Sequence, residues 1–220
     1  MGWLLESLNS SIGKKIIMAL TGIFLITFLT VHFMGNLTLF ANDGGESFNA
    51  YAKLLRSLKF MVILEVGLGL IFLFHILNGA RLFIENKIAR PTNYAVNGTR
   101  KNTNISSRTM IITGSTIFIF LVIHLYSFFV KHTLLHEGDS LFDLVRIAFS
   151  DHIYSWFYVI AMCILGFHLN HGFQSAFQTF GWNHKKYTPA VKFIGAIYAI
   201  IITIGFASMP IYFLFFYGGK

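Results

Sequence analysis

Four histidines lie deep inside long apolar stretches of this 220-residue sequence, one in each stretch: His32, His75, His124 and His168. A polar ring in an apolar environment is costly unless it is hydrogen-bonded or coordinates a metal, so each histidine is a candidate functional residue. Imidazole is a ligand for zinc, copper, iron and nickel. One buried histidine on each of four helices therefore predicts two sites with two imidazole ligands each.

The composition indicates which elements hold these histidines. Hydrophobic residues make up 55% of the chain and charged residues 12%, with a mean hydropathy of +0.65. Such a chain cannot bury its apolar surface in a water-soluble core, so we predict an all-α integral membrane protein. Apolar runs long enough for a hydrocarbon core of ~30 Å predict five transmembrane helices in a single membrane domain. They cover about residues 16–40, 60–84, 110–129, 153–176 and 193–216.

The segments between the spans are also patterned. Residues 3–8 are expected to form a short amphipathic lead at the membrane surface. Large apolar side chains recur at helical spacing between Phe48 and Leu58, with basic residues among them, which indicates an interfacial helix. Residues 131–152 are expected to form a mixed loop.

The net charge of +8 would favour a nucleic-acid partner in a soluble domain, but here it is interpreted through topology, and no nucleic acid is expected. Basic residues collect in the loops that stay inside. With the N-terminus inside, that side receives eleven of the 17 Lys and Arg: Lys14, Lys15, Arg81, Lys87, Arg90, Arg100, Lys101, Arg108, Lys185, Lys186 and Lys192. The chain is therefore predicted to have its N-terminus in the cytoplasm and its C-terminus outside.

Depth along the alternating spans predicts which histidines meet. The first and third spans run outward, which puts His32 and His124 ~24 and ~21 Å from the inner face, in the outer half. The second and fourth spans run inward, and His75 and His168 lie ~22 Å from the outer face. The pairs are therefore His32 with His124 at an outer level and His75 with His168 at an inner level, roughly 15 Å apart.

Haem is the group that suits such pairs, because it supplies four nitrogens itself and needs only two axial ligands. No cysteine or carboxylate lies at these depths to complete a tetrahedral metal site. The sequence lacks the Cys-x-x-Cys-His attachment motif, so the haems would be non-covalent b-type. We predict a bundle of the first four spans around two stacked haem b groups, with electron transfer as their chemistry. Gly35, Gly79 and Gly172 would leave space for a macrocycle or would simply permit close helix packing.

Two alternatives stay open. Any one of these histidines could be a hydrogen-bonded core residue, and His171, one turn from His168, is a rival ligand or a propionate or quinone contact. The competing class of protein is a proton-linked transporter with a histidine relay, which predicts acids or lysines among the histidines, broken helices and an internal repeat. We identified none of these features at the histidine depths.

The sequence resembles a known family in residues 11–22 (SIGKKIIMALTG), 32–37 (HFMGNL) and 48–52 (FNAYA). It is similar to the cytochrome b membrane-anchor subunit of succinate dehydrogenases and fumarate reductases, in the single-subunit form with two haems and five spans. The resemblance implies distal haem ligands at His32 and His124 and proximal ligands at His75 and His168. It also implies a location in the bacterial inner membrane and a flavoprotein partner with covalent FAD, which would carry the succinate site. An iron-sulfur subunit and a quinone, usually menaquinone, complete the implied partners.

Three further residues are of interest. Some menaquinol-oxidising members of the resembled family carry a glutamate two residues before the fourth histidine, where this chain has Gly166. Glu65, near the outer end of the second span, is our candidate for quinol proton transfer or is an interfacial residue without a catalytic task. Arg81, inward of His75, would contact haem propionates, signal topology or bind a lipid phosphate.

Overall fold

The computed structural model describes residues 2–89, 109–138 and 140–218, and within these ranges it contains helices and connecting turns but no strand. The helices in chain order are α1 (Gly2–Asn9), α2 (Ser11–Asn36), the 3-10 helix η1 (Leu37–Phe40), α3 (Glu46–Ser57), α4 (Met61–Ile88), α7 (Met110–His124), the π-helix η2 (Leu125–Leu134), α8 (Leu141–Ser150), α9 (His152–Thr179) and α10 (Thr188–Phe215).

Five helical stretches are long and apolar enough to cross a membrane, which confirms the predicted all-α fold with five membrane-spanning helices. They are Ser11–Phe40, Met61–Ile88, Met110–Leu134, His152–Thr179 and Thr188–Phe215. Four of the basic residues behind the predicted orientation, Arg90, Arg100, Lys101 and Arg108, lie outside the described residues. The orientation stays a prediction.

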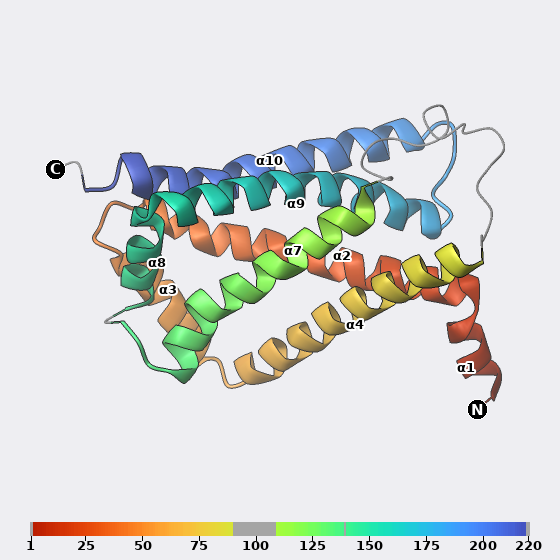
Figure 1. Cartoon of the computed structure of the whole chain (residues 1–220), viewed down its shortest axis with the longest axis horizontal. Helices are drawn as coiled ribbons and strands as arrows, with labels where there is room; N and C mark the ends of the chain where they lie inside the picture. The colour runs from red at the N-terminus through yellow and green to blue at the C-terminus, as the bar shows by residue number, and fades with distance from the viewer. Residues whose placement is uncertain (1, 90–108, 139, 219–220) are drawn as a thin grey trace.

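The first four spans surround a common axis, and the fifth lies outside them (Figure 1). Helix α2 packs against α4 and α9, and α7 packs against the same two helices. Helix α2 is therefore diagonal to α7, and α4 is diagonal to α9. Helix α10 covers α9 along its length and also contacts α2. Each predicted histidine pair therefore comes from two diagonal helices: one pair from α2 and α7, the other from α4 and α9.

A cluster of buried aromatic and aliphatic side chains closes one end of the bundle, where α3 and α8 lie (Figure 1). Its members come from η1, α3, α8, α9 and α10: Leu39, Phe48, Phe142, Val145, Phe149, Tyr158, Met209 and Phe213. Under the predicted topology this is the outer end, and α1 lies at the opposite, inner end.

The expectation of a mixed loop over residues 131–152 is wrong for most of its length. Residues 141–150 form α8, because Phe142, Val145 and Phe149 recur on one face and are buried, and the Ser140 side chain caps the helix by accepting from the Asp143 N–H. The third span also continues past Phe129 as the π-helix η2, which starts directly after His124. Arg56 of α3 donates to the Thr133 hydroxyl and ties this π-helix to the outer end.

Candidate functional site

The structure brings His32 and His124 together across the bundle. Their ring centroids are 5.9 Å apart and their planes are nearly perpendicular, at 88°. Two imidazoles on opposite sides of one metal ion, each bound at ~2 Å, have centroids roughly 6 Å apart. The spacing of this outer pair therefore suits two axial ligands of one iron.

Aromatic rings surround the outer pair. Phe28 stacks on His32 with centroids 5.4 Å apart, and Phe120 stacks on His124 at 5.6 Å. Phe206 of α10 lies 5.7 Å from His32, and Phe128 of η2 lies 5.4 Å from His124. The only hydroxyl bonded to either ring within the described residues is that of Tyr158, 3.2 Å from His124 Nδ1. The outer pair is therefore surrounded mainly by apolar rings, and one hydroxyl, that of Tyr158, contacts a histidine ring.

The inner histidines have a different environment, made by threonine and glycine. His75 of α4 lies against α2, where the Thr21 hydroxyl is 3.1 Å from its Nδ1. His168 of α9 lies against α7, where the Thr113 hydroxyl is 3.3 Å from its Nδ1. The residue after each threonine is a glycine, and a Cβ on Gly22 would lie 3.6 Å from His75 Cε1, while one on Gly114 would lie 3.4 Å from His168 Cε1. Both rings therefore lie directly against the neighbouring helix.

The two threonines and the two outer histidines belong to an internal repeat. Residues 21–32 (TGIFLITFLTVH) and 113–124 (TGSTIFIFLVIH) share threonine, glycine, phenylalanine, leucine and histidine at equivalent positions. Residues 74–79 (FHILNG) and 167–172 (FHLNHG) share phenylalanine, histidine and glycine. In both halves of the bundle, a span, a short outer helix and a second span follow in that order. Each predicted pair thus consists of equivalent residues of the two halves.

The repeat corrects our earlier conclusion that the sequence has none at the histidine depths. Both halves run in the same direction, which is the parallel type of repeat that transporters also use, so the repeat does not distinguish a transporter from an electron-transfer protein. The side chains that do face the histidines in the described residues are threonine, tyrosine, asparagine and phenylalanine. These are not the acids or lysines that a proton relay would use.

The repeat also separates the two levels. Thr21, which contacts the inner His75, precedes the outer His32 by eleven residues on α2, and Thr113 precedes His124 by the same interval. At 1.5 Å per residue this is ~16 Å along the helix axis. The contacts of His75 and His168 therefore put both of them about 16 Å inward of the outer pair.

Two other candidates lie at the inner level. His171 is half-buried and within electrostatic range of His168. His168, however, is the residue that matches His75 in the repeat and that contacts α7. Arg81 is engaged with its own helix and with α1: its Nε is 2.8 Å from Glu85 Oε1, and its Nη1 donates to Asn9 Oδ1 at 3.2 Å. The other carboxylate oxygen of Glu85 is 2.6 Å from Lys14 Nζ. These bonds tie α1, α2 and α4 together at the inner end.

Two of the glycines that sequence analysis singled out, Gly35 and Gly166, lie close to other side chains. A Cβ on Gly35 would lie 2.4 Å from the Tyr51 ring, so Tyr51 fills the space that was expected to receive a macrocycle, and close packing is the better interpretation there. A Cβ on Gly166 would lie 2.2 Å from the Thr203 hydroxyl of α10. This contact explains why a glutamate at position 166 does not fit the present packing. Glu65 is exposed on α4, in the first turns after the helix start.

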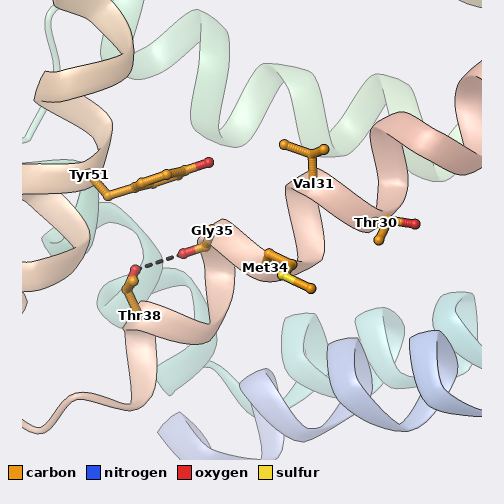
Figure 2. A pocket seen from close by; sticks show the side chains of 6 residues that line it. All are labelled: Thr30, Val31, Met34, Gly35, Thr38 and Tyr51. Atoms are coloured by element: carbon orange, nitrogen blue, oxygen red, sulfur yellow. Dashed lines mark hydrogen bonds between the residues drawn. The ribbon is translucent and has the colours of Figure 1, made fainter.

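A shallow pocket of about 380 Å³ lies near the C-terminal end of α2, and His32 and His124 are not among its lining residues (Figure 2). It is lined by Thr30, Val31, Met34, Gly35, Thr38 and Tyr51. Val31 and Met34 are strongly exposed, so the pocket opens on the apolar surface of the span. The Tyr51 ring extends from α3 over Gly35, and its hydroxyl has no hydrogen-bond partner among the described residues, while the Thr38 hydroxyl donates to the Gly35 carbonyl at 2.7 Å. Glu65 does not line this pocket.

The donor set fits haem better than a bare metal ion. Within the described ranges no three His, Cys, Asp or Glu side chains converge as a metal site would require, whereas His32 and His124 meet from two diagonal helices, and His75 and His168 lie on the other two. A macrocycle that brings four nitrogens of its own needs only such a pair.

Comparison with known proteins finds a family match in the first half of the bundle. The family model of the succinate dehydrogenase/fumarate reductase transmembrane subunit matches residues 15–96, which include α4 and most of α2. No curated protein and no solved structure matches the chain.

Proposed function

We propose that this chain, whose residues 15–96 match the family model of the succinate dehydrogenase/fumarate reductase transmembrane subunit, is the di-haem cytochrome b of such a complex. In this proposal it anchors the complex in the bacterial inner membrane. It passes electrons between an iron-sulfur subunit and a membrane quinone, while a flavoprotein subunit with covalent FAD interconverts succinate and fumarate.

The observation that carries the proposal is the apposition of His32 and His124 from diagonal helices, with ring centroids 5.9 Å apart. His32 and His124 would hold the outer haem b, and His75 and His168 the inner one. Each haem would supply a one-electron carrier, held by the two imidazoles of its pair. The aromatic rings of Phe28, Phe120 and Phe206 would exclude water from the outer ligands.

Visible spectroscopy of the purified complex tests this function. The dithionite-reduced minus oxidised spectrum and the haem-to-protein ratio should show two haem b per chain. A chain that is folded and membrane-integrated but contains no haem would overturn the proposal and would favour the transporter alternative.

We further propose that the quinone reacts near the outer face, in the pocket between the C-terminal end of α2 and Tyr51. An electron carrier at the outer level is needed only if the quinone reacts near that face, because an inner site could be reached without it. The pocket has the volume of a small-molecule site, opens toward lipid, and presents the Tyr51 hydroxyl as a donor for a quinone carbonyl. Electrons would then cross most of the membrane, and moving each electron across a membrane potential of 100 mV changes its free energy by about 2.3 kcal/mol. The family resemblance favours menaquinone.

Two variants test the outer quinone site. Tyr51→Phe removes the hydroxyl and keeps the ring against Gly35, and we expect lower quinone-linked activity while succinate oxidation with a soluble acceptor and both haems persist. If Glu65 transfers the quinol protons, Glu65→Gln should also lower quinone-linked activity while succinate oxidation with a soluble acceptor and both haems persist. Full quinone activity in Glu65→Gln would remove Glu65 from the mechanism, and a quinone or inhibitor located beside His75 would overturn the outer site.

A further inference from the structure

We infer that Thr21 and Thr113 are positioning residues for the inner histidine pair, each holding the Nδ1–H of one imidazole so that its Nε2 lone pair is available to iron. This inference rests on the proposed function, because the orientation of these rings matters for redox chemistry only if the chain binds haem. It concerns residues that no sequence motif of a haem site assigns.

Hydrogen-bond accounting gives the direction that we infer for each threonine contact. A hydroxyl has one proton to donate and two lone pairs that accept. The Thr21 hydroxyl donates to the Ile17 carbonyl at 2.9 Å, with the Met18 carbonyl at 3.1 Å as a second acceptor. Its lone pair therefore remains to accept from His75 Nδ1 at 3.1 Å. A threonine bonded to the carbonyl one turn before it is thus converted into a fixed acceptor.

The Thr113 hydroxyl follows the same scheme on α7. It donates to the Met110 carbonyl at 3.1 Å and lies 3.3 Å from His168 Nδ1. With Nδ1 protonated, the neutral imidazole carries its lone pair on Nε2, which is the nitrogen that can bind iron. Such second partners fix the tautomer and the ring orientation of metal-binding histidines and raise their basicity.

The glycine after each threonine also lies against the histidine ring. A Cβ on Gly22 or Gly114 would be in ordinary van der Waals contact with the ring, so a methyl group fits at either position and only larger side chains are excluded while the Nδ1 stays at the hydroxyl. Since Thr21 and Thr113 have equivalent positions in the repeat, both ligands of the inner haem receive the same support. The consequence is a specific expectation: two substitutions on different helices act on one and the same haem.

The experiment is a redox titration of the purified complex carrying Thr21→Val, Thr113→Val or both. Valine keeps the shape and removes the acceptor, so the imidazole becomes less basic and stabilises ferric iron less. We expect each single variant to move the midpoint potential of the inner haem to a more positive value. The double variant should move it about twice as far, and the outer haem should not change. Thr21→Ser and Thr113→Ser should keep the wild-type potential.

The chain offers matched controls. Thr27 of α2 and Thr116 of α7 also donate to the carbonyl one turn before them, at 3.0 and 2.9 Å, but Thr27 is exposed, Thr116 is half-buried and neither contacts a histidine. Thr27→Val and Thr116→Val should leave both potentials unchanged.

The outcomes separate this inference from the function on which it rests. Absence of haem in the wild-type complex would overturn the proposed function. Two haems with potentials unmoved by Thr21→Val and Thr113→Val, or moved equally by the control variants, would overturn the inference alone. If a valine variant loses the inner haem, retention of that haem in the matching serine variant supports the inference, and its loss there overturns it.

Discussion

The two histidine pairs occupy equivalent positions in a repeated sequence, yet the bundle surrounds them differently. The outer rings of His32 and His124 are stacked on phenylalanines, close to the aromatic cluster that caps the bundle. The inner rings of His75 and His168 contact threonine hydroxyls and glycines, and no aromatic contact is found for either within the described residues. The same histidine pattern thus has mainly aromatic neighbours at one level and threonine hydroxyls and glycines at the other.

In the proposed function, this difference would give two similar cofactors different properties. Both haems would have histidine ligands, so differences in redox potential would come from ring hydrogen bonds, burial and nearby charge. The inner level adds a charged network of Lys14, Arg81 and Glu85 at its boundary, whereas the outer level has the Tyr158 hydroxyl. Each of these contributions can be removed separately.

The largest expected effect comes from removing a ligand. We expect His32→Ala and His124→Ala each to abolish the outer haem and leave the inner one, and His75→Ala and His168→Ala each to do the reverse. The measurement is the haem-to-protein ratio together with the redox titration of the remaining component. His184→Ala, in the loop before α10, is a control that should keep both haems. Loss of the same spectral component from His32→Ala and His75→Ala would break the pairing.

The sequence predicted the spans and the apposition of His32 with His124 for simple reasons. The apolar runs are long enough to leave no other fold, and helical rise converts residue numbers into depth. Helix α8 was missed because its three buried residues are separated by Asp143 and Arg146, which made the segment resemble a polar loop. The family match covers residues 15–96 and so does not reach this helix.

The threonine contacts could not be predicted in the same way. Thr21 and Thr113 bond their own helix backbone, as do Thr27 and Thr116, and these bonds do not separate the two kinds. The one sequence feature that sets Thr21 and Thr113 apart is that each begins a Thr-Gly pair, with the threonine eleven residues before an outer histidine. Its meaning depends on which helices become neighbours, since His75 and His168 come from other spans.

Packing density gives the next largest difference between the levels. A Cβ on Gly205 would lie 2.2 Å from the ring of Phe33, next to the outer pair, whereas a Cβ on Gly22 would lie 3.6 Å from His75. We expect Gly205→Ala to lower the free energy of unfolding by roughly 1–3 kcal/mol through overpacking. Gly22→Ala should have little effect, because its contact is of ordinary length. Thermal unfolding in detergent measures both, and equal losses would contradict the contrast in packing.

A smaller effect is expected from the outer hydroxyl. Tyr158→Phe keeps the buried ring and removes the oxygen that lies 3.2 Å from His124 Nδ1. If His124 binds iron through Nε2, this oxygen accepts its Nδ1–H, and its loss should move the midpoint potential of the outer haem to a more positive value. The inner haem should not respond. Tyr212→Phe, in the aromatic surroundings of the outer cap, is the matched control. A shift of the inner haem in Tyr158→Phe would remove the distinction between the levels.

The smallest expected effect concerns the charges at the inner boundary. Glu85 is paired with both Lys14 and Arg81, so the three groups carry one net positive charge. Arg81→Leu leaves a neutral pair, while Glu85→Gln leaves two cations. Because positive charge favours the reduced haem, the inner midpoint potential should fall slightly in Arg81→Leu and rise slightly in Glu85→Gln. Arg81 and Glu85 are substantially exposed, so solvent weakens both effects. The outer haem, ~16 Å farther away at helical rise, should respond less than the inner one. Shifts of the same sign in both variants would mean that the network acts by holding α1, α2 and α4 together rather than through its charge.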